Sequence, residues 1–94
     1  MLRFEWDERK NKSNRAKHQV WFEEAQSAFD DPHARFFADP DHSEDETRFL
    51  LMGLSSASTL LVVVHCYKES DEMIRIISAR KGTRRERLFY EEGI

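Results

Sequence analysis

Basic side chains gather near one end of the sequence, in the stretch IRIISARKGTRRE at residues 74–86. Guanidinium groups bind phosphate through paired N–H donors, and backbone N–H groups at the start of a helix bind the same anion. The pattern therefore predicts an anion-binding site, with salt bridges to acidic segments as the alternative. The basic residues concerned are Arg75, Arg80, Lys81, Arg84 and Arg85.

The spacing of Arg75 and Arg80 poses a geometric problem, because residues five apart in a regular strand point to opposite faces. The surrounding isoleucines predict a strand from about Met73 to Ser78. We therefore expect Arg80 to lie in the exit from this strand, where a turn sets its direction. Arg80 is then the better phosphate ligand. Arg75 is expected to be structural and paired with an acid if it points to the helix-covered side.

The segment LLVVVHCYK at residues 60–68 is a predicted strand with two titratable side chains. One of its faces is fully apolar and is expected to face the helices; it consists of Val62, Val64 and Cys66. His65 and Tyr67 are therefore expected on the more open face, where they could transfer protons or stack on a base. The alternative is that both are ordinary half-buried strand residues.

A metal site is disfavoured, although His42 stands among carboxylates in the segment DPDHSEDE. The spacing lacks a helical zinc-ligand pair and the glycine and glutamate of a calcium loop, so a solvated acidic turn is favoured. A serine hydrolase has less support, because no G-x-S-x-G motif occurs. Cys66 is the only cysteine and is predicted to be a buried thiol. We expect no metal and no cofactor.

The elements that must position these groups follow from periodicity and capping signals. Asp7 is a candidate N-cap for a solvated helix, and Pro32 ends a second helix whose apolar stripe begins at Trp21. Thr83 and Glu86 have capping-box spacing, and Gly93 is a candidate C-terminal stop. The expected strands lie within residues 2–6, 33–39, 47–56, 58–68 and 72–78.

The element order predicts an α+β fold, in which β-α-α is followed by an antiparallel β-meander and a C-terminal helix, with the helices on one face of the sheet. With 94 residues, 39% of them hydrophobic, the chain is expected to form a single domain over residues 1–94. Its longest apolar run is Leu60 to Val64, far below the roughly 20 residues of a membrane span. No signal peptide is recognised, so we expect a cytoplasmic protein without membrane contact.

Charge is segregated along the chain, although the formal net charge is only −3. Residues 1–22 carry six Lys/Arg against three acids, and residues 75–87 carry six against one. Residues 23–46 carry nine acids and one arginine. This segregation favours a basic patch made from both chain ends beside an acidic rim, over an evenly mixed soluble surface.

Four separated motifs together resemble the BrnT family of bacterial toxins, and they span nearly the whole chain. These are DERKNKSNRAKH, FEEAQSAFDDP, HSEDETR and SARKGTRRERLFYEE. The resemblance implies a RelE-like domain and a ribonuclease that works without a metal, cuts RNA and arrests growth. It also implies a BrnA antitoxin with a ribbon-helix-helix region, so that operator DNA is contacted only through the antitoxin.

Carried over by position, the resemblance supplies Arg75, Arg80 and Lys68, and from the helical motif Lys10, Lys12, Asn14, Lys17 and His18. We expect Arg80 to be the main catalytic group, with Arg75 or Lys68 assisting and His65 or Tyr67 as the proton carrier. We expect RNA contacts from Lys10, Lys12, Lys17, His18, Lys81, Arg84 and Arg85. The chain departs from the family pattern at Lys68, where many relatives have arginine, at Gln19, which replaces a glycine, and at Gly82, which replaces an alanine. A second function stays open: a non-catalytic binding module that holds a protein partner or DNA through its basic C-terminal end.

Overall fold

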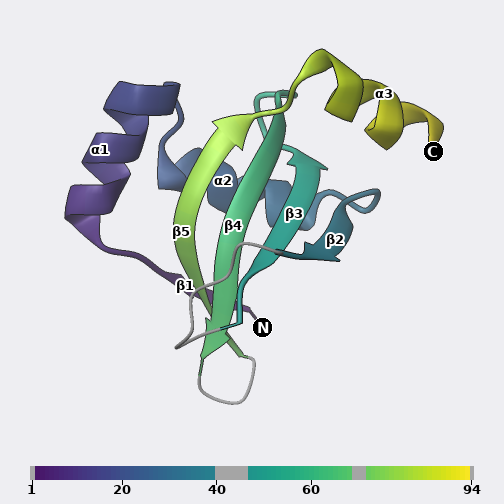
Figure 1. Cartoon of the computed structure of the whole chain (residues 1–94). Coiled ribbons are helices and arrows are strands. Elements are labelled where there is room, and N and C mark those ends of the chain that lie inside the picture. The colour runs from purple at the N-terminus through teal and green to yellow at the C-terminus, as the bar shows by residue number, and fades with distance from the viewer. Residues whose placement is uncertain (1, 40–46, 69–71, 94) are drawn as a thin grey trace.

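The computed structural model describes residues 2–39, 47–68 and 72–93, and the acidic turn predicted around His42 lies outside them. The described residues form one five-stranded sheet with helices (Figure 1). The elements are β1 (Arg3–Glu5), α1 (Glu8–His18), α2 (Phe22–Ser27), the 3-10 helix η1 (Ala28–Asp30), β2 (Arg35–Ala38), β3 (Phe49–Leu54), β4 (Leu60–Lys68), β5 (Met73–Lys81) and α3 (Arg84–Glu92).

The strand order is β1-β5-β4-β3-β2, and the meander from β2 to β5 is antiparallel throughout. The predicted α+β class and element order are confirmed. The first strand differs from the expectation of a purely antiparallel sheet, because β1 pairs in parallel with residues 73–75 at the start of β5. This pairing places Glu5 directly beside Arg75.

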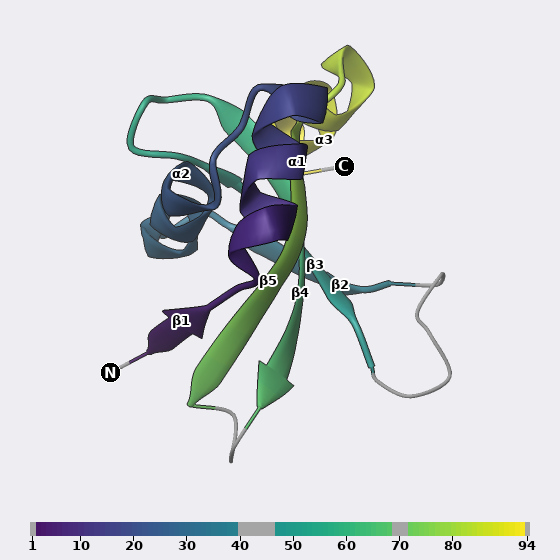
Figure 2. The ribbon, with the colours of Figure 1, turned by 90° about the vertical axis from the view of Figure 1, so that its left-hand side faces the viewer.

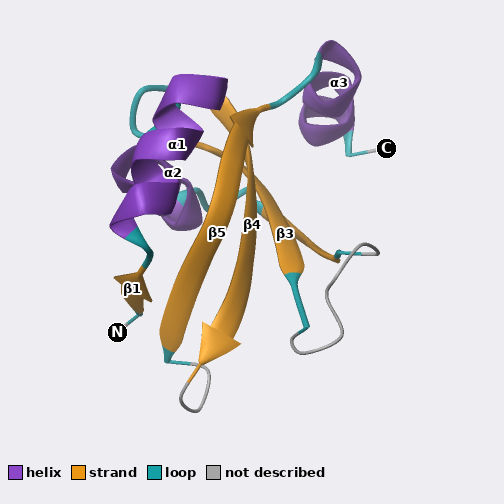
Figure 3. Ribbon diagram, turned by 60° about the vertical axis from the view of Figure 1, so that its left-hand side comes forward, coloured by secondary structure: helices purple, strands orange, loops and turns teal. Residues whose placement is uncertain are grey.

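The sheet buries both of its faces, and the prediction that all helices share one face is wrong for α3. Figure 3 shows α1 and α2 on one side of the sheet and α3 on the other. The first face packs Leu61 and Val63 against Phe22 of α2. The second packs Val62 of β4 against Phe89 of α3. Apolar residues on both faces of β4 therefore require a helix on each side.

A β-bulge in β5 changes the direction of the arginines. Val64 pairs with Ser78 and the next residue of β4 pairs with Ile76, so Ile77 has no direct partner. One extra residue reverses the alternation of the strand beyond it. Arg75 and Arg80 therefore share the face that carries α3. The prediction that β5 ends near Ser78 is wrong, since the strand continues to Lys81.

Local capping signals are confirmed at the predicted helix ends. The Asp7 side chain accepts hydrogen bonds from two N–H groups of α1. Thr83 and Glu86 form a complete capping box at α3, and Gly93 ends it in the left-handed conformation with φ 71°. No helix in the described part of the chain is long and apolar enough to cross a membrane.

Helix α1 is attached through buried polar groups and has no apolar stripe. Its buried residues are Asn11 and Asn14. The Asn14 amide donates to the Ala79 carbonyl at 2.8 Å and accepts the Ala79 N–H at 3.1 Å. Asn14 thereby provides hydrogen-bond partners for the backbone at the outer edge of β5, in the part of the strand that β1 does not reach. Figure 2 shows α1 running alongside this part of β5.

Candidate functional site

The start of β5 contributes Arg75 to a cluster of opposite charges on the face of the sheet that carries α3. The Nη1 atom of Arg75 lies 2.7 Å from Oε2 of Glu5, and Nζ of Lys68 lies 3.7 Å from the same oxygen. The hydrogen bond from Arg75 is the main cause that lowers the pKa of Glu5. Arg75 is thus paired with an acid, as expected for a structural residue, but it lies on the face opposite α1 and α2.

Near the other end of β5, Arg80 forms a two-pronged ion pair with Glu86 of α3. Both guanidinium-to-carboxylate distances are 2.8 Å. The hydrogen bonds from Arg80, with help from the Thr83 N–H, lower the pKa of Glu86 to about 2. The side chain of Arg80 remains 43% exposed. Its guanidinium is therefore held in one direction by Glu86, while the side chain as a whole remains partly exposed.

The two arginines are separate anchor points along this face. Their β4 partners, Val62 and Cys66, are four residues apart, which corresponds to about 13 Å along a strand. Arg75 is directed to β1 and Arg80 to α3, because each is paired with a carboxylate of that element. We call this side of the sheet, with Arg75, Lys68 and Arg80, the arginine face. It can contact an extended anionic ligand at two separate places.

His65 does not lie on the open face, and this prediction is wrong. The residue is fully buried on the face that carries α2, where it packs against Phe29 at a ring distance of 4.9 Å. The reason is that the paired residues Phe49 and His65 share a face with Leu51 and Val63. Burial is the main cause that lowers the pKa of His65, so the neutral imidazole is favoured.

Tyr67 shares this face and is half-buried, with its ring 5.4 Å from that of His65. His65 and Tyr67 therefore lie on the opposite face of the sheet from Arg80. Their positions agree better with the alternative prediction, that His65 and Tyr67 are ordinary strand residues. Cys66 is buried, as predicted.

The remaining predicted cations lie in two groups, which flank β5 along its outer edge and at its end. Lys10, Lys12, Lys17 and His18 belong to α1. At the other flank, Lys81 ends β5, and Arg84 and Arg85 occupy the first turn of α3. All are exposed except His18, which is half-buried. By its pairing with Leu61, Lys81 belongs to the face that carries α2, opposite Arg80.

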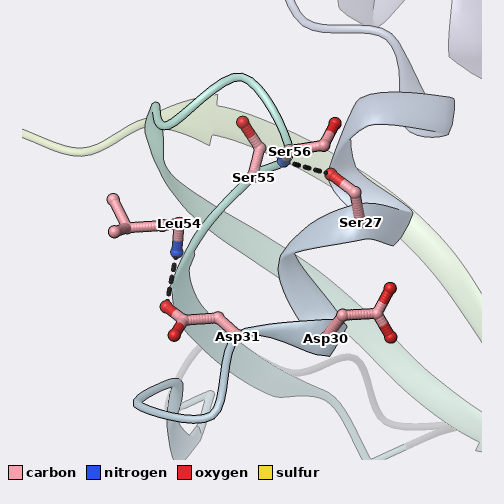
Figure 4. A pocket seen from close by; sticks show the side chains of 6 residues that line it. All are labelled: Ser27, Asp30, Asp31, Leu54, Ser55 and Ser56. Carbon is pink, nitrogen blue, oxygen red and sulfur yellow. Dashed lines mark hydrogen bonds between the residues drawn. The ribbon is translucent and has the colours of Figure 1, made fainter.

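A hollow of about 250 Å³ beside η1 is lined by acidic side chains, in contrast to the basic residues described above (Figure 4). Asp30 and Asp31 line it together with the hydroxyls of Ser27 and Ser55. The Asp31 carboxylate accepts a hydrogen bond from the Leu54 N–H at 2.8 Å and another from the Tyr90 hydroxyl of α3. Carboxylates repel phosphate, so this hollow fits a structural clasp for α3 and is unsuited to nucleic acid. Within the described residues, no group of three or more His, Cys, Asp and Glu side chains is arranged to hold a metal ion.

Sequence reasoning missed the carboxylate partners of the arginines. Glu5 comes from a strand at the far end of the chain, so no local signal connects it to Arg75. The spacing of Glu86 from Thr83 predicts a capping role, whereas its ion pair with Arg80, six residues earlier, has no such local signal. The bulge at Ile77 is visible only in the pairing of β5 with β4, so the sequence of β5 alone does not predict it.

The arrangement of this sheet and its helices is that of a known bacterial toxin structure. The crystal structure of the Brucella abortus ribonuclease toxin BrnT matches with a TM-score of 0.66 over 89% of this chain and 100% of that chain, at 21% sequence identity. At this identity the similarity establishes the fold. The search of curated proteins returned no match.

The family follows from the sequence itself. The model of the family described as "Ribonuclease toxin, BrnT, of type II toxin-antitoxin system" matches residues 6–86. The chain therefore belongs to the BrnT family of ribonuclease toxins, whose members form type II toxin-antitoxin systems with an antitoxin. The finer RelE-like relationship stays a prediction.

Proposed function

We propose that the chain is a metal-independent endoribonuclease whose α3-side sheet face binds RNA through Arg80, Arg75 and Lys68. Support comes from one observation: the bulge at Ile77 turns both arginines of the family motif to a single face. RNA is anionic along its whole length, so a face with two guanidinium groups and an ammonium group fits it.

The chemistry proposed is attack of an RNA 2′-hydroxyl on the adjacent phosphate. Such a reaction needs the attacking and leaving oxygens in line and the developing charge on the phosphate stabilised. Arg80 is proposed as the main stabilising group, because its side chain is 43% exposed and its guanidinium is already oriented by Glu86. Phosphate would compete with Glu86 for the same N–H donors.

His65 is buried on the opposite face of the sheet from Arg80, so the structure does not support it as the proton-transfer group. Catalysis on this face would rest mainly on orientation and charge stabilisation, which together account for a large part of enzymatic rate enhancement. Tyr67 has the same difficulty, since it lies on the α2 side of the sheet. We therefore assign the reaction to the arginine face and leave His65 and Tyr67 outside the proposed mechanism.

The proposed partner is a BrnA-like antitoxin with a ribbon-helix-helix region, which would bind operator DNA while the toxin stays off the DNA. The proposed compartment is the cytoplasm, where messenger RNA is available as substrate. These assignments rest on the family and on the charge pattern. The RNA contacts proposed on the flanks come from α1 and from the β5–α3 junction.

The decisive experiment compares Arg80→Ala with Arg87→Ala in an RNA cleavage assay that contains a chelator. Arg87 is a matched control, because it is also ion-paired on α3, at 3.2 Å from Glu91, but lies outside the proposed site. Loss of one charge-stabilising contact is expected to slow cleavage about 10²- to 10³-fold, whereas the control keeps its rate. Arg80→Lys, which keeps the charge but not the fork, should fall between them.

Two results would overturn this proposal. Equal cleavage by the parent and a folded Arg80→Ala variant would remove Arg80 from the mechanism. RNA binding by the parent protein without any cleavage would favour the non-catalytic binding module. The ion pairs of Arg80, Arg75 and Lys68 with carboxylates are compatible with that function too. Urea unfolding of each variant separates loss of function from loss of fold.

A further inference from the structure

A hollow of about 180 Å³ lies between α1 and β5, outside the ion-paired arginines. At about 30 Å³ per water molecule, it has room for roughly six waters, which is enough for a phosphate group with part of its sugar. Its walls come from Lys10, Ser13, Lys17 and His18 of α1, and its floor from Ile77 and Ser78 of β5.

The spacing along α1 places these side chains on one face of the helix. Residues three, four and seven apart stand above one another at 3.6 residues per turn, which applies to Lys10, Ser13 and Lys17. The same helix face carries Asn14, whose amide is bonded to Ala79. The asparagine therefore fixes the distance between the lysines and the strand.

The lysines of the hollow differ electrostatically from the cations of the sheet. Across residues 2–39, 47–68 and 72–93, no carboxylate oxygen lies within 4.0 Å of the ammonium of Lys10 or Lys17, whereas Arg75, Arg80 and Lys68 are all paired. Two lysines without a counter-ion beside a serine hydroxyl favour an anion of high charge density. They disfavour a metal cation by repulsion.

One residue of the hollow belongs to the arginine face. Ser78 on its floor pairs with Val64, and Arg80 pairs with Val62, so both side chains belong to the same face of the sheet. Two residues along a strand correspond to about 7 Å. A ligand held at Arg80 can therefore extend directly towards α1.

We propose that this hollow is a second phosphate subsite, which binds the phosphodiester next to the one held at Arg80. The inference rests on the proposed ribonuclease function and adds the path of the RNA strand. The strand would cross β5 from the α3 end towards α1, with Lys10 and Lys17 gripping one phosphate. His18 and Ser13 would donate hydrogen bonds at the same place.

The test uses fluorescence anisotropy with short 2′-O-methyl RNA, which lacks the attacking hydroxyl and stays intact. The variant is the double substitution Lys10→Gln and Lys17→Gln. The matched control is Arg9→Gln with Arg15→Gln, which removes the same charge from the same helix outside the hollow. Urea unfolding establishes that both variants remain folded.

Salt dependence counts the phosphate contacts that each variant loses. For single strands the slope of log K against log salt changes by about 0.7 per phosphate contact. The hollow variant should lose about 0.7 from this slope and about tenfold in affinity at low salt, whereas the control should keep the slope. Parent affinity should rise when a second phosphate is added to a one-phosphate oligonucleotide, and the hollow variant should lose this gain.

Each outcome decides between the two proposals. If the parent binds and cleaves RNA but the hollow variant behaves like the control, the subsite is wrong and the ribonuclease function stands. If the parent binds the methylated RNA with the expected slopes but cannot cleave ordinary RNA, the subsite stands and catalysis fails. If the parent does not bind RNA at all, both proposals are overturned.

Discussion

Replacing Glu86 by glutamine tests whether the ion pair with Arg80 holds α3 on the sheet. Glutamine keeps a side-chain oxygen that can accept the Thr83 N–H, so the capping interaction survives and the charge is lost. The change therefore separates the ion pair from the helix cap. The matched control is Glu91→Gln, which removes the charge of the exposed i,i+4 pair with Arg87.

The expected magnitude follows from the pKa of Glu86. A fall from the ordinary 4.5 to about 2 corresponds to about 3 kcal/mol in favour of the ionised form. Arg80 is 43% exposed, so water and salt screen the pair and we expect about 1 to 2 kcal/mol at pH 7. The control should lose less than about 0.5 kcal/mol.

The pH dependence has a defined sign. Because the pKa of Glu86 is lowered in the folded state, its contribution is present above pH 4.5 and is lost as the pH falls towards 2. The free energy of unfolding, measured in urea at several pH values, should therefore differ between the parent and Glu86→Gln at pH 7. This difference should shrink across that window. A difference that stays constant from pH 7 to pH 2.5 would refute the electrostatic explanation.

Two further substitutions test the attachment of α1 and the assignment of His65. Asn14→Ala leaves the Ala79 N–H and carbonyl and the Val20 carbonyl without their partner, and should cost about 2 to 4 kcal/mol in urea unfolding, whereas the neighbouring Ser13→Ala changes little. His65→Leu removes an Nε2 atom that is buried without a partner in the described structure and should change stability by less than about 1.5 kcal/mol. RNA cleavage by this variant at the parent rate is the expected result, and a loss of 10²-fold in a folded protein would return His65 to the mechanism.

Local features of the fold could be predicted from sequence because their causes are local. The Asp7 cap and the Thr83–Glu86 capping box depend on residues within one turn, and both are confirmed. The three long strands follow from runs of branched and aromatic residues. The end of the second helix before Pro32 likewise follows from a single proline.

The candidate site was less predictable because it depends on strand register. The direction of Arg80 follows from a bulge at Ile77 that only the pairing with β4 defines. The burial of His65 depends on which face of β4 meets α2, and both faces are apolar enough to be covered. The carboxylate of Glu5 reaches Arg75 only after distant strands have paired.

The bonds that position the arginine face also determine when that face can form. Glu5 and Arg75 are 70 residues apart, and Asn14 and Ala79 are 65 residues apart. Contacts of such long sequence separation form late, because a long loop must close before they contribute. The meander of β3, β4 and β5 can pair from nearby residues, whereas α1 has no apolar stripe and must wait for β5. During synthesis, the arginine face and the α1 hollow would therefore be completed only after Ala79 has emerged and β5 has paired.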